Sequence, residues 1–425
     1  MPTPALLDKF FPRYTRFDPA VPVWCVTPDE GRAIHRFFDT SPISPSGRYA
    51  ALFRFSREDR PPELGDTGRV IVIDLDTGDE IQVAETAGFE AQMGANINWG
   101  GTDRELFFND VSPSDYRPFA WNCDFASGAR RAMRGTVYHA ATNGKFLISA
   151  NLANSARTQP GYGVIVPREN LRRNIAPAED DGFHITDTHS GETRLLVSIA
   201  ELLRRAAPPA RYTDPARYEF YGFHSKFNPQ GDRVMVSVRA FPAAEQARWN
   251  MFAIDHNAIE FAWFTLDLDA REIHCPVGPE EWCKGGHHAT FFPDGRRISM
   301  NLAHDRSHLR LMQVDLDGGN YRQIRDGLIG SGHPTVTPDG THIITDSYEG
   351  EGVAFGDGTV PLRWIDLRDG TEECLVRVNV RQPCPDGTMR VDPHPAWDRG
   401  NRWVTFNGFV DGTRRVFIAD LGGKM

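Results

Sequence analysis

A short apolar run that ends in an aspartate and a tight turn occurs seven times along the chain, and this repetition constrains the fold most. Aspartate and glycine tolerate the positive backbone angles of a hairpin, so each copy is expected to join two outer strands of one small sheet. Successive copies lie roughly 48 to 80 residues apart, a spacing typical of the blades of a β-propeller. The copies are residues 73–78, 123–128, 186–191, 266–269, 314–319, 365–370 and 419–423.

A second series of seven turns alternates with the first. Most of these turns follow a stretch that ends in an aromatic or aliphatic residue, and β-rich runs such as residues 297–302 come after them. The two series therefore define first-to-second and third-to-fourth strand hairpins, and they predict an all-β, seven-bladed β-propeller. The second series comprises residues 45–47, 101–103, 143–144, 229–231, 293–295, 338–340 and 399–400.

The last blade lacks a fourth strand of its own, because Asp420 lies five residues before the C-terminal Met425. The short apolar segment 21–27 precedes the first blade, and pairing it with the last blade would cover an exposed sheet edge. We predict that residues 35–425 form the blades and that residues 21–27 complete the last one.

Length alone would allow several domains, but the repeat favours a single domain over residues 1–425, with a helical and loop insertion at 200–217.

Composition limits the partners and the location. The net charge of −10 disfavours nucleic acid or an anionic membrane as a partner, so an acidic ligand would need a local positive site. The sequence has no signal-peptide core, no apolar run of eighteen residues and no CxxC pair among its six cysteines, which predicts a cytoplasmic protein. It also lacks the GxSxG, Walker, HExxH and strand-linked GxGxxG motifs of common enzyme classes.

Four histidines stand five residues before the first-to-second strand turn in blades four to seven. They are His224, His288, His333 and His394. Five residues of regular strand would place each imidazole roughly 16 Å from the turn, and the shared register predicts that all four project toward one mouth of a central channel. Converging neutral imidazoles can bind a transition metal. Hydrogen-bonded structural histidines are the alternative.

Other polar residues accompany these histidines. Arg390 and Asp392 precede His394 at alternate positions and are expected on the same strand face. His35 leads into the inner strand of blade one and could join the same rim. The polar, turn-rich segment 157–163 suggests a loop held for contact, although a plain connecting loop is the alternative.

Segments 286–295, 332–340 and 392–397 resemble oligogalacturonate lyases and related seven-bladed polysaccharide lyases with TolB-like repeats. In that family three histidines and a glutamine hold a manganese ion, and the substrate is a uronate-containing oligosaccharide. The resemblance therefore implies an acidic oligosaccharide substrate and a divalent metal, with Mn²⁺ as the first choice.

Carried over residue by residue, the resemblance implies that His288 and His394 are metal ligands, and we choose His333 as the third. The sequence departs from the family at two positions. The second histidine of the family pattern corresponds to Asp392, and the glutamine corresponds to Met389. Glucuronate is consequently as plausible a substrate unit as galacturonate.

These residues support a hypothesis of β-elimination across a 4-linked uronate. Neutralising the substrate carboxylate acidifies the adjacent C5 proton, and a base then removes this proton as the bond at C4 breaks. His224 is the predicted base, Tyr162 the predicted proton donor and Arg157 a predicted catalytic cation. The predicted substrate-binding residues are Arg390, Gln159 and His35. Two other classes remain open: a non-catalytic propeller that binds a glycan or protein, and a hydrolase or epimerase that uses the same cavity.

Overall fold

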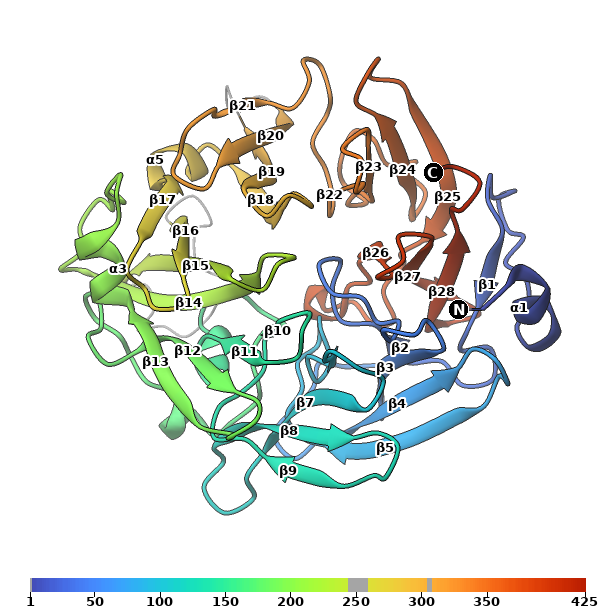
Figure 1. Ribbon diagram of the computed structural model, residues 1–425, viewed down its shortest axis with the longest axis horizontal. Helices are drawn as coiled ribbons and strands as arrows, with labels where there is room; N and C mark the ends of the chain where they lie inside the picture. Colours follow the sequence, from blue (N-terminus) through green and yellow to red (C-terminus); the bar gives the residue numbers. More distant parts are fainter. Residues whose placement is uncertain (1, 244–258, 304–307) are drawn as a thin grey trace. The chain divides into compact units, whose positions relative to one another are not determined.

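The computed structural model describes residues 2–243, 259–303 and 308–425. Over these residues, strands assemble into seven antiparallel four-stranded sheets (Figure 1). Six sheets contain consecutive strands, and the seventh has the order β1-β28-β27-β26. The prediction of a seven-bladed β-propeller is confirmed.

The first three blades follow one another along the chain. They consist of β2 (Ala33–Ile34), β3 (Tyr49–Phe55), β4 (Gly68–Asp74) and β5 (Glu80–Thr86); β6 (Asn98–Trp99), β7 (Glu105–Val111), β8 (Pro118–Asp124) and β9 (Arg130–Ala132); and β10 (His139–Ala140), β11 (Phe146–Ser149), β12 (Gly182–Asp187) and β13 (Thr193–Ser198).

The remaining four blades follow the same plan. They consist of β14 (Tyr218–Phe227), β15 (Arg233–Pro242), β16 (Glu260–Asp267) and β17 (Ile273–Val277); β18 (Gly286–Phe291), β19 (Arg297–Ala303), β20 (Leu309–Asp315) and β21 (Arg322–Gln323); β22 (Thr335–Val336), β23 (His342–Thr345), β24 (Thr359–Asp366) and β25 (Glu372–Asn379); and β26 (Ala396–Trp397), β27 (Trp403–Val410) and β28 (Thr413–Asp420) with β1 (Val23–Cys25).

The helices are short; α1 precedes the first strand and the others lie between strands. The α-helices in the described ranges are α1 (Pro4–Phe10), α2 (Leu152–Ser155), α3 (Ile199–Arg205) and α5 (Pro279–Trp282). Ser198 caps α3 by accepting a hydrogen bond from the Glu201 amide. In the part of the chain that the structure describes, none of the helices has the length and apolar character needed to span a membrane.

The chain divides into two compact units. The first unit contains residues 1–111, 121–131 and 331–425, and the second contains residues 112–120 and 132–330. Each unit has buried apolar clusters between its sheets. The two units are described separately below.

The aspartate turns form where the sequence placed them. In the first blade the Gly78 amide donates to the carbonyl of Asp74 at 2.8 Å, and Gly78 has a φ of +79°. The Asp74 carboxylate in turn accepts a hydrogen bond from the Asp76 amide at 3.0 Å. A glycine is needed at this position because the positive φ strains other residues. The turn chemistry thus fixes the hairpin between the third and fourth strands.

The N-terminal strand completes the last blade, as predicted. Strand β1 pairs antiparallel with β28, with Val23 opposite Ala419 and Cys25 opposite Phe417. Between them, Trp24 is fully buried and packs edge-on against Trp403, with ring centroids 6.0 Å apart. The first unit therefore buries its N-terminal segment inside its own core.

The first blade begins slightly earlier than predicted. Strand β2 starts at Ala33 rather than at residue 35, and residues 35–42 then leave the sheet before Ile43 forms an isolated bridge with Ala50. A turn motif at residues 45–47 could not reveal this excursion, because it marks only the end of the hairpin. The excursion matters since it carries aromatic side chains toward the histidines of the same unit.

The prediction of a regular inner strand through each histidine was wrong. Strands β22 and β26 have only two residues each, and His333 and His394 lie before them rather than within them. Pro334 follows His333 and Pro393 precedes His394, and proline cannot donate to a strand ladder. The inner strands therefore begin only after these prolines.

The other two histidines lie in longer strands that are irregular at the histidine. Strand β14 shifts register between Gly222 and Ser225, which brackets His224, and β18 shifts between His287 and Thr290, which brackets His288. His288 has a φ of +57°, and His394 in the last blade has a φ of +51°. Such bulges and positive φ values aim a side chain away from the regular strand alternation.

We predict that replacing Trp24 with alanine destabilises the protein by ~3–5 kcal/mol, because the change leaves a cavity where β1 packs on the last blade. Urea unfolding followed by circular dichroism measures this loss. Ile81→Ala is the control, since Ile81 on β5 is 40% exposed and its loss should change stability by less than ~0.5 kcal/mol. Equal effects of the two substitutions would contradict the role given to β1.

Candidate functional site

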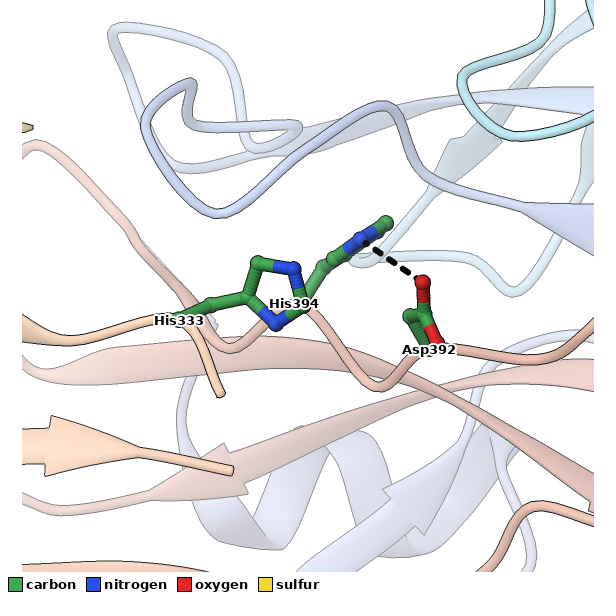
Figure 2. Close-up of side chains that lie close together, drawn as sticks. All are labelled: His333, Asp392 and His394. Atoms are coloured by element: carbon green, nitrogen blue, oxygen red, sulfur yellow. Dashed lines mark ion pairs between the residues drawn. The ribbon is translucent and has the colours of Figure 1, made fainter. Parts of the chain in front are cut away.

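Three buried side chains of the first unit form a compact cluster of metal-ligand type. One ligand atom each from His333, Asp392 and His394 lies within 4.8 Å of the others. The imidazole rings of His333 and His394 are nearly perpendicular, with centroids 4.3 Å apart. Figure 2 shows His394 facing Asp392, and its Nε2 lies 3.8 Å from a carboxylate oxygen.

A second carboxylate, that of Asp346, accepts hydrogen bonds from both His333 and His394. It accepts hydrogen bonds from the backbone amide and from Nδ1 of His333, at 2.7 and 2.8 Å, and from the backbone amide of His394 at 3.1 Å. Asp346 is fully buried and directly follows β23. It therefore connects the segments that precede β22 and β26.

Gly332 permits this close approach. It has a φ of +60°, and a Cβ atom added at this position would lie 2.2 Å from both the carbonyl oxygen and a carboxylate oxygen of Asp346. Any larger residue would push His333 away from Asp346. The glycine thus sets the distance between the histidine and its carboxylate.

The excursion after β2 covers the cluster with apolar rings. Phe37 lies 4.7 Å from His394 and Phe38 lies 5.2 Å from His333, measured between ring centroids. His35 is also buried there, and its Nε2 lies 3.4 Å from the carbonyl oxygen of Pro393. This burial gives His35 a supporting position beside His394 rather than an exposed position at a rim.

Burial disfavours protonation of His35 and of His394. It lowers the pKa of His35 to about 4. Burial, with the neighbouring His333 and His35 as further causes, holds the pKa of His394 well below its ordinary value. A neutral imidazole keeps a nitrogen lone pair, which a metal ligand requires.

Arg390 supplies a positive charge beside the cluster. Its Nε donates to the Asp392 carboxylate at 2.9 Å, and its side chain is 27% exposed. Asp392 therefore lies between a partly exposed cation and the His394 ring. Met389, which occupies the glutamine position of the family pattern, is instead fully buried beside Ala91 and Cys384.

The donor set fits a divalent transition metal. Two imidazoles and one carboxylate suit Mn²⁺, Fe²⁺ or Zn²⁺, and three protein ligands leave coordination positions for a substrate. Both ring nitrogens of His394 are buried, and within the described ranges neither makes a hydrogen bond. Because buried polar atoms normally have partners, these nitrogens support a ligand role.

In the second unit, the predicted base lies among aromatic rings. Nδ1 of His224 is hydrogen-bonded to the hydroxyl group of Tyr138. The His224 ring stacks nearly parallel to Trp263, and Tyr162 lies edge-on with its ring centroid 6.0 Å away. The structure thus brings His224 and Tyr162 together and adds Tyr138, which sequence reasoning missed. Tyr138 stands five residues before the turn at 143–144, so the spacing that marked His224 could also have marked Tyr138.

The segment that carries Tyr162 is held by charged partners inside the second unit. Arg157 is buried, and its Nη1 lies 4.0 Å from the carboxylate of the fully buried Glu219. Burial lowers the pKa of the Arg157 guanidinium. Gln159 accepts a hydrogen bond from Arg239 at 2.8 Å. These contacts tie the loop to β14 and β15.

His288 lies in the second unit, and its predicted role as a metal ligand stays a prediction. Its ring lies 4.4 Å from that of His287, between centroids.

Asp346 is the main residue that sequence reasoning missed. Thr335 pairs with Ile344 in the antiparallel ladder. Continuing this register by two residues places His333 opposite Asp346, so aligning the two strands could have identified Asp346.

The sequence matches no protein-family model, and no curated protein matches it. Two solved structures are similar over nearly the whole chain. An oligogalacturonate lyase in complex with manganese has a TM-score of 0.63 and 14% identity, covering 96% of each chain. An oligogalacturonate lyase from Vibrio parahaemolyticus has a TM-score of 0.64 and 14% identity, covering 97% of this chain and 96% of that chain. At this identity the similarity shows the fold.

We predict that chelator-treated protein binds a single divalent cation and that Asp392→Asn weakens binding by at least about tenfold, because the variant loses the only anionic ligand of the cluster. Calorimetric titration with Mn²⁺ and elemental analysis measure binding. His342→Gln is the control, since His342 stacks on Trp364 in the same unit. Retention of less than about 0.1 equivalent of metal by the wild type would contradict the prediction.

Proposed function

We propose that this protein is a carbon–oxygen lyase that cleaves a 4-linked uronate within an acidic oligosaccharide by β-elimination. The observation that carries the proposal is the buried cluster of His333, Asp392 and His394. The scaffold that holds it is similar in fold to an oligogalacturonate lyase in complex with manganese. Galacturonate and glucuronate are both compatible with this arrangement.

His333, Asp392 and His394 would hold the divalent cation, with Mn²⁺ as the first choice. When bound, the cation would withdraw negative charge from the substrate carboxylate and so acidify the proton on C5. Arg390 is the nearby cation of the chain that can reach solvent, and we assign it to the same carboxylate. A local positive charge is needed because the net charge of −10 repels an anionic sugar.

Elimination then needs a proton acceptor and a proton donor. A base removes the C5 proton, the electron pair forms the C4–C5 double bond, and the C4–oxygen bond breaks as the leaving oxygen gains a proton. We assign His224 as the base, acting through Nε2 while Nδ1–H donates to the oxygen of Tyr138. Tyr162, which packs on the same ring, is assigned as the proton donor.

Arg157 and Gln159 are assigned to the loop that positions Tyr162. The fully buried Glu219 lies 4.0 Å from Arg157 and also pairs with Arg173, and Arg239 donates to Gln159, so both side chains already have partners within the protein. This arrangement favours support of the loop over direct neutralisation of the substrate. Their substitution should therefore affect Tyr162 as well as sugar binding.

We predict that the protein, incubated with oligogalacturonates or glucuronate-containing oligosaccharides, forms an unsaturated uronate with ultraviolet absorbance. Chelator should abolish the signal and Mn²⁺ should restore it, because the carboxylate would otherwise keep its charge. Absorbance and mass spectrometry of the products measure this. Products heavier by one water per cleavage would identify a hydrolase, and binding without cleavage would identify a glycan-binding protein.

We predict that His224→Gln lowers kcat by ~10²–10⁴-fold, because it removes the proton acceptor. Tyr138→Phe should lower kcat less, by about tenfold, since it removes only the hydrogen bond that orients His224. Initial rates at saturating substrate measure both effects. His189→Gln is the control, because His189 lies in the aspartate turn after β12. Full activity of folded His224→Gln would refute the assignment.

A further inference from the structure

We propose that Asp346 is a positioning residue for the metal centre, which it organises by fixing the proton of the His333 ring on Nδ1 and by holding the backbone at His394. The inference rests on the proposed function only in treating His333, Asp392 and His394 as ligands. It does not depend on the substrate or on the elimination chemistry.

The contacts of Asp346 reach both histidines through one carboxylate group. Oδ1 accepts from the amide and from Nδ1 of His333, while Oδ2 accepts from the amide of His394 and also lies 3.0 Å from Nδ1 of His333. The three donors come from two segments that are 61 positions apart in the sequence (394 − 333). A carboxylate has enough lone pairs for all of them, whereas an amide or hydroxyl group has fewer.

The hydrogen bond to Nδ1 determines which nitrogen of His333 can bind a metal. An ionised carboxylate only accepts hydrogen bonds, so the Nδ1 atom beside it carries the proton. When the ring carries this single proton, Nε2 has the lone pair. Metal-binding histidines commonly use this arrangement, in which a carboxylate fixes the tautomer and the orientation of the ring.

The surroundings of Asp346 keep this geometry rigid. Asp346 and His333 are each no more than 1% exposed. Gly332 leaves no space between the backbone and the carboxylate, and Phe37 and Phe38 pack against the His333 ring from another segment. The carboxylate and the ring therefore have little freedom to separate without a change in the surrounding packing.

The same blade contains a second histidine and carboxylate pair that serves as a matched control. Nε2 of His342 lies 3.5 Å from the carboxylate of Asp366, which also pairs with the exposed Arg368 at 2.6 Å. This pair is partly exposed and stands at the aspartate turn after β24. It resembles the His333 pair in chemistry but has no link to His394 or Asp392.

The decisive substitution is Asp346→Asn, compared with Asp366→Asn. Asparagine keeps the shape of aspartate, but its NH₂ group cannot accept a hydrogen bond, so either the amide of His394 or the donors of His333 lose their acceptor. Long-range ¹⁵N–¹H spectra of histidine-labelled protein identify the tautomer, with His333→Gln used for assignment. Titration with Mn²⁺ alone measures affinity, and thermal unfolding checks that each variant is folded.

We expect the wild type to show His333 protonated on Nδ1. In Asp346→Asn the affinity for Mn²⁺ should fall about 10- to 100-fold. Asp366→Asn should leave both the His333 signals and the affinity unchanged. If Asp346→Asn does not fold, the tautomer of His333 in the wild type decides the question.

Three results would overturn the proposal. They are protonation of His333 on Nε2 in the wild type, unchanged Mn²⁺ affinity in folded Asp346→Asn, and absence of Mn²⁺ binding by the wild type. A wild-type protein that binds Mn²⁺ with the expected tautomer but cleaves no uronate would refute the proposed lyase function alone. The spectra and the activity assay therefore judge the two proposals separately.

Discussion

Backbone hydrogen bonding at the start of the inner strands is the constraint on which the candidate metal centre depends. Prolines beside His333 and His394 interrupt the strand ladder, so the amides of both histidines need other acceptors. Asp346 accepts both of them, and Asn407 accepts the amide of His35 at 3.0 Å. Where the strand ladder is interrupted, backbone amides donate to side-chain oxygens instead. These hydrogen bonds bring side chains from several segments together.

The cluster carries more buried charge than stability alone would favour. Asp346 and Asp392 are both removed from solvent, and burying a carboxylate costs free energy unless hydrogen bonds or opposite charges compensate for it. Asp346 is compensated by backbone and ring donors, whereas Asp392 depends on Arg390. A bound cation would compensate Asp392 further. Such costly groups concentrate at functional sites because chemistry, rather than packing, requires them.

The sequence allowed the blades to be predicted, because hairpin turns depend on a few adjacent residues. The same local reasoning identified β1 as the missing strand, since Asp420 left the last sheet incomplete. It failed where neighbouring strands decide the structure. The bulge at His224 arises from pairing between strands, and the role of Asp346 depends on its position opposite His333. Turn spacing carries no information about either.

Strands β1 and β28 pair in one sheet but lie far apart in the sequence. The ribosome therefore synthesises them at widely separated times. About 390 residues are synthesised after Cys25 before Thr413 emerges, so Trp24 and its neighbours stay without their final packing throughout that interval. The apolar segment therefore stays exposed on the nascent chain until β28 has been made. Circular permutation that joins the two ends would make this pairing local and should speed maturation.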